Sequence, residues 1–205
     1  MIKTDFVVSG ELQVNCYFVY DDVSKKAIII DPGQSYDLVT RKIEDLDLKP
    51  ELLINTHGHF DHILCDDKIR EKYNIPLAVH KDDIEMLQNA ELNASVMIGE
   101  PTVIKYPEII FDKDKTKETS FCKYSVINTP GHSKGSVCIL IGNTLFSGDT
   151  VFYGSVGRTD LFGGNHNEII SSVEKIKKLP LKTKIFPGHG PQTTLEREIK
   201  INPYF

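Results

Sequence analysis

The sequence contains no tryptophan, only three methionines and no long apolar run. A membrane-crossing helix needs about 18 or more consecutive apolar residues, and no stretch approaches that length. The chain also reaches an acidic residue at Asp5, too early for the apolar segment of a secretory signal. We therefore expect no association with a membrane and a cytoplasmic location.

An excess of basic residues is also missing. The chain has 24 Lys+Arg against 29 Asp+Glu, which gives a formal net charge of −5. Proteins dedicated to nucleic acids normally present a basic face, so this balance argues against a nucleic-acid partner. A length of 205 residues is enough for one domain with a sizeable core. We expect a single domain over residues 1–205.

Histidine is scarce but concentrated. The chain has seven histidines, and three of them fall within Thr56-His57-Gly58-His59-Phe60-Asp61-His62. This stretch follows the apolar run Leu52–Ile54, which predicts a buried strand ending just before it. His57 and His59 share one side of an extended segment, because alternate residues share a face. Imidazole and carboxylate are ligands for zinc and related metals, so we favour a metal site over a histidine-rich surface loop.

The four cysteines show no C-x-x-C spacing. Most of them lie beside strand-like apolar residues, which predicts buried thiols in a reducing compartment. Cys65 follows His62 by three residues, so a helix there would bring it within reach of the metal site. Its part in that site stays open.

Strand and helix signals alternate along the chain, which is typical of an α/β protein. In the first half we expect strands at 6–8, 13–20, 27–30, 52–55 and 77–79 and helices at 37–47, 63–73 and 81–89. Residues 93–123 are expected to form a loop, with the charged run 112–118 as a solvated turn. In the second half we expect strands at 124–128, 137–141, 144–146 and 184–186 and helices at 165–178 and 193–200.

Three more candidate ligands follow strand signals in the second half. His132, Asp149 and His189 each lie beside a glycine at the end of an expected strand. Loops at strand ends are where a scaffold presents ligands to an open cleft. Together with the first cluster they give seven candidate ligands, more than one structural zinc needs. The sequence therefore predicts a site for two metals.

These motifs resemble, in order, those of the metallo-β-lactamase superfamily. The resemblance is carried by Asp31-Pro32-Gly33, Thr56–His62, Thr129-Pro130-Gly131-His132, Ser147-Gly148-Asp149-Thr150 and Pro187-Gly188-His189-Gly190. It implies an α/β fold, a four-layer αβ/βα sandwich with the site at one edge between two sheets. Residues 154–164 and the tail Thr193-Thr194…Glu198…Asn202-Pro203 further resemble short glyoxalase II-like hydrolases, of the hydroxyacylglutathione hydrolase type.

The resemblance also implies a role for each ligand. His57, His59 and His132 would hold one metal, and Asp61, His62 and His189 would hold the other. Asp149 would bridge the two, and Asp61 and Asp149 would be the catalytic carboxylates. The cofactors would be two divalent metal ions, expected to be zinc, with iron or manganese as alternatives.

The implied activity is hydrolysis of hydroxyacyl thioesters such as S-D-lactoylglutathione. Two cations flanking one water lower its pKa to about 7, so a metal-bridging hydroxide would attack the small-molecule substrate. A thiolate with a solution pKa near 8.5 leaves without strong acid assistance. Arg158 and Tyr153 are the candidate substrate contacts. Arg158 could clamp a substrate carboxylate or pair with Asp160, and both interpretations stay open.

Other activities fit parts of the pattern. A persulfide dioxygenase would hold one iron through His57, His132 and Asp149. The run Pro187–Pro191 resembles the hydrolase tail better. A lactonase, a β-lactamase and a non-catalytic metal-binding domain are weaker alternatives. The chain ends at Phe205, so we expect none of the helical domain with which long glyoxalase II enzymes bind glutathione. The physiological thiol and the oligomeric state stay open.

Overall fold

Two six-stranded sheets carry the fold of this computed structural model, which describes residues 1–205. In the first sheet the strands lie in the order of the sequence: β1 (Ile2–Ser9), β2 (Val14–Asp21), β3 (Lys26–Ile30), β4 (Lys49–Ile54), β5 (Leu77–His80) and β6 (Ile109–Phe111). The second has the order β14-β13-β10-β9-β8-β7, with β7 (Lys115–Glu118), β8 (Lys123–Asn128), β9 (Val137–Ile141), β10 (Thr144–Gly148), β13 (Lys184–Pro187) and β14 (Thr193–Thr194).

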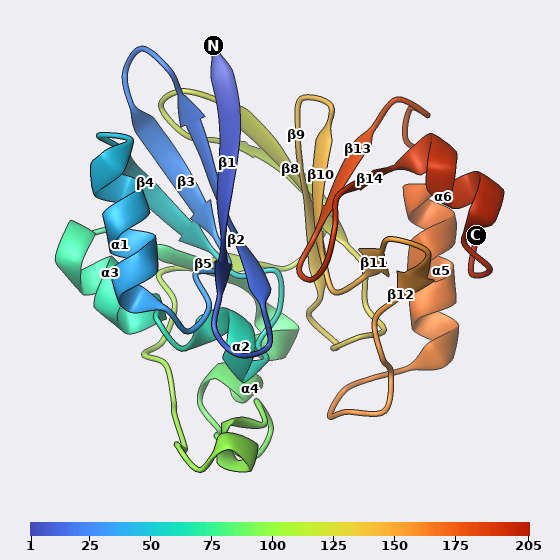
Figure 1. Cartoon of the computed structure of the whole chain (residues 1–205). Helices are drawn as coiled ribbons and strands as arrows, with labels where there is room; N and C mark the ends of the chain where they lie inside the picture. Colours follow the sequence, from blue (N-terminus) through green and yellow to red (C-terminus); the bar gives the residue numbers. More distant parts are fainter.

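Helices cover the outer face of each sheet (Figure 1). The first sheet carries α1 (Tyr36–Asp45) and α3 (Asp66–Tyr73), and the second carries α5 (His166–Ile176) and α6 (Leu195–Ile201). Shorter elements lie at the strand ends: α2 (Phe60–Ile63), η1 (Lys81–Asp83), α4 (Ile84–Leu87), η2 (Ser95–Ile98) and the ribbon β11 (Val151–Phe152) and β12 (Ser155–Val156). The predicted four-layer αβ/βα arrangement is confirmed.

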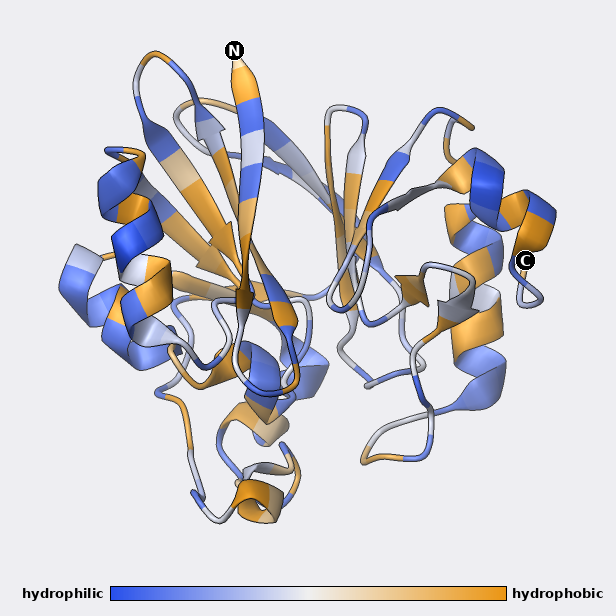
Figure 2. Ribbon diagram, viewed as in Figure 1, coloured by the Kyte–Doolittle hydropathy of each residue, from blue (hydrophilic) through white to orange (hydrophobic).

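Apolar burial explains the layering. A cluster of 14 buried residues, including Tyr17, Ile54 and Phe146, joins the inner faces of the two sheets. Two further clusters lie beneath the helices on the outer faces. Because β2 is buried along both faces, its residues alternate between the central cluster and an outer one. Figure 2 shows the resulting pattern, with apolar strands and helices that are hydrophilic toward solvent.

Parallel pairing brings distant strand ends together. In β3 and β4 Ile30 pairs with Ile54, and in β10 and β13 Gly148 pairs with Pro187. Residues that directly follow paired parallel strands lie at the same edge of the sheet. This pairing is why Asp31 meets Thr56 and why Asp149 meets His189.

The prediction of a loop over residues 93–123 was wrong in part. The segment contains η2 and the strands β6 and β7, and β7 includes part of the charged run expected to be a solvated turn. Both strands lie at sheet edges, β6 beside β5 and β7 beside β8. A charged edge strand has little pattern of its own, since its partner's free backbone groups determine it.

The helix predicted at 63–73 forms only from Asp66 onward, as α3, and Ile63 is the last residue of the short helix α2. The Gly33 amide donates to the His62 carbonyl, and the Cys65 amide donates to the Gly33 carbonyl. These bonds replace the helical ladder between Ile63 and Asp66. Similarly, the segment expected to be helical from Thr193 starts with β14, and Thr194 then caps α6 by accepting from the Arg197 amide. None of the helices has the length and apolar composition needed to cross a bilayer.

Candidate metal centre

The first group of ligands comes from the end of β4. His57 and His59 lie on the loop between β4 and α2, and Asp61 and His62 lie in α2. All four are buried. A Cβ on Gly58 would lie 2.9 Å from the Met86 side chain, so this glycine lets the segment pass close to α4.

The second group comes from the other sheet. His132 follows β8, Asp149 follows β10 and His189 follows β13. His132 and Asp149 are buried, while the His189 side chain is 27% exposed at the mouth of the cleft. Both sheets therefore contribute ligands at the edge where they meet.

The seven predicted ligands converge in three overlapping sets. Within each set the candidate ligand atoms lie within 4.8 Å of one another: His57, His59 and His132; His57, His62 and Asp149; Asp61, His62 and His189. His59 Nδ1 lies 2.9 Å from His132 Nε2, and His62 Nε2 lies 3.3 Å from His189 Nε2. Two imidazole lone pairs facing each other at such distances fit a shared cation between them.

Asp149 lies between the two groups of ligands. Its Oδ1 is 3.5 Å from His62 Nε2, and its Oδ2 is 3.5 Å from both His132 Nε2 and His189 Nε2. One carboxylate thus faces both the set with His132 and the set with His62 and His189. Its carboxylate is therefore placed to contribute an oxygen to either set.

Hydrogen bonds on the far side of the rings orient the ligands. His132 Nδ1 donates to the Arg158 carbonyl at 2.7 Å, and His189 Nδ1 donates to the Leu12 carbonyl at 2.9 Å. Since a carbonyl can only accept, both rings carry a proton on Nδ1 and turn Nε2 toward the site.

Asp31 orients two more ligands. Thr56 Oγ1 donates to Asp31 Oδ2 at 2.7 Å, so it can accept from His57 Nδ1, which lies 3.1 Å away. Asp31 Oδ2 also lies 3.1 Å from His62 Nδ1. Asp31, which directly follows β3, therefore fixes the His57 and His62 rings.

The buried polar atoms fit a metal. His57 Nε2 and Asp149 Oδ1 are buried without a hydrogen-bond partner. Such groups are costly unless they are paired or coordinate a metal. Both residues lie among other candidate ligands, where a divalent cation would satisfy them.

In the metal-free site, the pKa of each histidine depends on its burial and on the charged groups around it. Burial lowers the pKa of His57 well below its usual value, and burial together with the nearby His132 lowers that of His59 to about 3. Burial also opposes charge on His62, but Asp61, Asp149 and Asp31 outweigh it and raise the His62 pKa to about 10. The metal-free site therefore holds a proton on His62, which a metal would have to displace.

One residue of the site, Asp83, was not predicted from the sequence. Asp83, fully buried in η1, accepts from the Gly58 amide at 2.9 Å, the Ser133 hydroxyl at 2.6 Å and the Gly135 amide at 2.6 Å. It thus joins the loop of His57 and His59 to the loop of His132. In the sequence it stands beside Asp82 at the start of the helix expected at 81–89, and nothing there distinguishes the two aspartates.

The candidate substrate contacts lie apart from each other. Arg158 lines the metal cleft at its rim, and its Nε and Nη2 hold both oxygens of Asp160 at 2.6 and 2.8 Å. Tyr153 does not line the cleft, and the Arg197 guanidinium lies 3.3 Å from the centre of its ring. The pairing of Arg158 with Asp160 is thus present, and Tyr153 stacks against α6.

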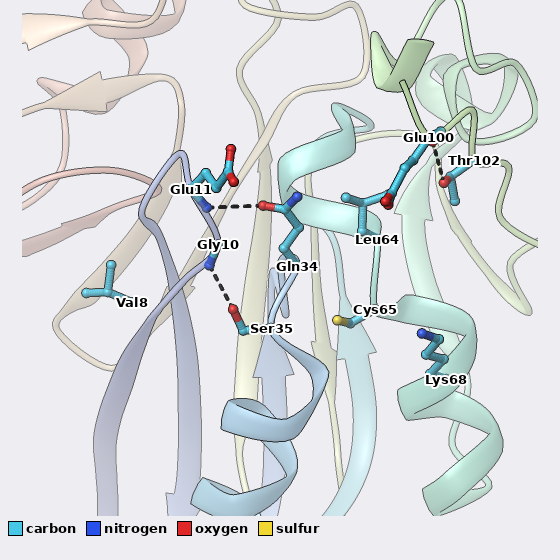
Figure 3. A pocket seen from close by; sticks show the side chains of 10 residues that line it. All are labelled: Val8, Gly10, Glu11, Gln34, Ser35, Leu64, Cys65, Lys68, Glu100 and Thr102. Carbon is cyan, nitrogen blue, oxygen red and sulfur yellow. Dashed lines mark hydrogen bonds between the residues drawn. The ribbon is translucent and has the colours of Figure 1, made fainter. Parts of the chain in front are cut away.

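Cys65 belongs to none of the three ligand sets. It is buried at the start of α3 and lines a different cavity with Gln34, Ser35 and Lys68 (Figure 3). Burial raises the pKa of its thiol to about 12. The neutral thiol therefore packs within the fold, away from the metal ligands.

The comparisons agree with this architecture. The model of the metallo-beta-lactamase superfamily matches residues 9–189, and the chain belongs to this superfamily. Its fold is the metallo-beta-lactamase fold, and the chain is a metal-dependent hydrolase whose superfamily typically binds divalent metals.

Relatives and solved structures are similar over almost the whole chain. The probable metallo-hydrolase YqgX of Bacillus subtilis is 36% identical over 95% of this chain and 93% of its own. The hydroxyacylglutathione hydrolase GloC of Haemophilus influenzae is 30% identical over 94% of this chain and 92% of its own. The crystal structure of BLEG-1 B3 metallo-beta-lactamase is 36% identical, with a TM-score of 0.95, over 98% of this chain and 99% of its own.

Proposed function

We propose that this chain is a binuclear hydrolase that cleaves hydroxyacyl thioesters such as S-D-lactoylglutathione. The observation that carries the proposal is the position of Asp149, whose two oxygens face both groups of histidines at 3.5 Å. The similarity to GloC, whose name describes a hydroxyacylglutathione hydrolase, supports the thioester as substrate.

Each candidate ligand would hold one of two cations, or lie between them. His57, His59 and His132 would hold one cation, and Asp61, His62 and His189 the other, with Asp149 between them. Two such cations activate a shared water at neutral pH and polarise a carbonyl. Asp31 and the carbonyls of Leu12 and Arg158 keep the ligand rings in place, so the site is arranged before substrate arrives.

The candidate ligands fit more than one metal. Imidazole and carboxylate suit zinc, iron and manganese, and we propose zinc in both positions. A small-molecule substrate and a cytoplasmic location belong to the same proposal, in keeping with the four cysteines, none of which forms a disulfide.

Two other activities remain to be separated from this one. A persulfide dioxygenase would use one iron on His57, His132 and Asp149, and would leave the grouping of Asp61, His62 and His189 without a use. A β-lactamase is the second candidate, since the similar BLEG-1 carries that name.

The decisive experiment combines metal content with three assays. We expect protein purified without added metal to carry about two metals per chain and to hydrolyse S-D-lactoylglutathione. We expect Asp149→Ala to abolish hydrolysis and to lower the metal content. One iron per chain with oxygen uptake on glutathione persulfide would replace the proposal with the dioxygenase. Hydrolysis of nitrocefin but of no thioester would replace it with the β-lactamase.

A further inference from the structure

The cleft above the metal ligands has an apolar lining. It has a volume of about 540 Å³, and its walls beyond the candidate ligands consist of Arg158 and six apolar residues: Leu12, Phe60, Ala94, Met97, Ile98 and Leu161. Pockets of this size accept small molecules, and their few polar groups set the orientation of the ligand. Here the polar groups are almost all candidate metal ligands, so the rest of the cleft favours an apolar group.

A backbone carbonyl in each wall of the cleft accepts a hydrogen bond from a ligand or from a residue beside one. The Leu12 carbonyl accepts from His189, and the Arg158 carbonyl accepts from His132. The Asn93 carbonyl accepts from the Phe60 amide, between His59 and Asp61, at 2.9 Å. The walls are therefore held at fixed positions relative to the candidate ligands, as a substrate-binding surface requires.

The wall formed by η2 has features that folding alone does not explain. Met97 is 75% exposed in this turn, and Figure 2 shows the turn as an apolar element at the far end of the molecule. An exposed methionine gains little from folding, since its apolar area stays in water. Ala94, just before the turn, has a φ of +67°, a left-handed conformation that costs a non-glycine residue about 1 kcal/mol or more.

Buried polar residues hold this turn in its position. Asn93 and Ser95 are fully buried. The Asn93 side chain donates to the Thr102 carbonyl and accepts from the Ser95 amide, and the Ser95 hydroxyl accepts from the Thr102 amide, each at 2.9 Å. A strained and anchored turn that presents exposed apolar side chains to a cleft is arranged for contact with a ligand.

The charge of the cleft disfavours an anionic group at this wall. Arg158 is the only lysine or arginine in the lining, and it pairs with both oxygens of Asp160. An anionic substituent would meet no free positive charge beyond the metals, whereas an aliphatic one would cover Met97 and Ile98.

We propose that Met97 and Ile98 of η2 determine specificity by receiving the aliphatic part of the acyl group, so that the substrates are thioesters of uncharged acyl chains of several carbons. This inference rests on the proposed thioester hydrolysis and names its substrate class. Each buried methylene stabilises a complex enough for about a fourfold change in binding.

Two measurements on the metal-loaded protein test this. The first compares kcat/KM for the acetyl, butanoyl, hexanoyl and adipoyl thioesters of glutathione, with S-D-lactoylglutathione as reference. We expect the hexanoyl thioester to exceed the acetyl one at least tenfold, and the adipoyl thioester, which ends in a carboxylate, to lose that gain. The second measures binding of S-hexylglutathione and S-methylglutathione by calorimetry, which needs no turnover. We expect the hexyl compound to bind at least tenfold more tightly.

Two matched variants test whether Met97 causes the preference for the longer chains. Met97→Gln keeps the length of the side chain but adds an amide, and it should reduce both ratios at least threefold. Val96→Thr changes an exposed residue of the same turn that does not line the cleft, and it should leave both ratios unchanged. Equal binding of the two S-alkyl compounds, or equal effects of the two variants, would overturn the apolar wall. Hydrolysis of no thioester despite selective binding of the hexyl compound would instead overturn the proposed function.

Discussion

The Asp83 carboxylate accepts a 2.6 Å hydrogen bond from the Ser133 hydroxyl, and both residues are fully buried. Ser133 follows the ligand His132, and Asp83 also accepts from Gly58, which separates His57 from His59. The contact therefore connects ligands that come from different sheets. It therefore fixes the distance between His132 and the loop that carries His57 and His59, which together form one of the three ligand sets.

We expect Asp83→Asn to weaken metal binding by on the order of 10- to 100-fold, as is usual when a group that orients ligands is lost. The amide presents a donor where the carboxylate accepted from Ser133 or Gly135, so a buried donor loses its partner. That loss should also lower the free energy of unfolding by about 2 kcal/mol. Competition with a metallochromic chelator measures the affinity. Asp82→Asn is the matched control, since the Asp82 side chain is 47% exposed, and equal effects of both variants would contradict the role of Asp83.

Gly188 is a second position where the site depends on a close approach. A Cβ there would lie 2.2 Å from Asp149 Oδ1 and 2.8 Å from His62 Cε1. We expect Gly188→Ala to displace these ligands and to reduce the metal content to about one per chain or less, with loss of hydrolysis. Elemental analysis of the purified variant measures this.

Gly190 provides the control for Gly188. It has a φ of +74° and open space around a Cβ. Gly190→Ala should therefore cost about 1 kcal/mol of stability through its backbone and leave the metal content unchanged. Full metal content in Gly188→Ala would show that the ligands tolerate the shift.

Much of this site can be predicted from the sequence because its ligands lie in short local motifs. The ligand motifs stand at strand ends beside glycines, and the strand signals around them come from apolar runs such as Leu52–Ile54. The alternation of strands and helices indicates the α/β class, whereas the four layers were expected from the resemblance to the metallo-β-lactamase superfamily. Local pattern was therefore enough for the fold class and for bringing the candidate ligands together.

The rest depends on contacts that are distant in the sequence. Asp83 meets Ser133 fifty residues later, and no spacing rule indicates that pairing. The break between α2 and α3 depends on Gly33, about thirty residues before it. The strand β7 exists because β8 pairs with it, although its own residues are charged. The left-handed Ala94 likewise has no local signal, since alanine rarely adopts that conformation.

The buried carboxyl of Asp66 should make the free energy of unfolding depend on pH. This fully buried carboxyl accepts from Asn55 at 3.2 Å, and its Oδ2 has no partner. Burial raises its pKa well above the unfolded value of 3.8. Between those two pKa values the folded protein binds one proton more than the unfolded chain. The free energy of unfolding therefore falls as pH rises, by up to about 1.4 kcal/mol per pH unit from this group.

We expect Asp66→Asn to remove that slope. The variant should gain stability relative to the parent as pH rises from about 4 toward neutral, and the gain should vanish near pH 4. Urea unfolding of the metal-loaded proteins at several pH values measures the difference. Asp45→Asn removes an exposed carboxyl and should leave the slope unchanged. Parallel curves for the parent and Asp66→Asn would show that Asp66 is ionised in the folded protein.

Glu198 holds the C-terminal helix α6 to the strand β14 and to the ribbon of β11 and β12. Its fully buried side chain accepts from the Thr193 hydroxyl, the Arg197 guanidinium, the Gly154 amide and the Asn202 side chain at 2.6 to 2.9 Å. Gly154 lies in the turn between β11 and β12, so the carboxylate joins that ribbon to α6.

We expect Glu198→Gln to lower the free energy of unfolding by about 3 kcal/mol, because the amide cannot accept at both positions and leaves buried donors without partners. Chemical denaturation with an unchanged m-value measures this loss. The control is Glu196→Gln in the same helix, where the Glu196 side chain is 56% exposed and pairs with Lys200. That surface pair should change stability by no more than about 0.5 kcal/mol. Similar losses for the two variants would mean that the charge of α6, rather than the buried network around Glu198, stabilises the C-terminal end.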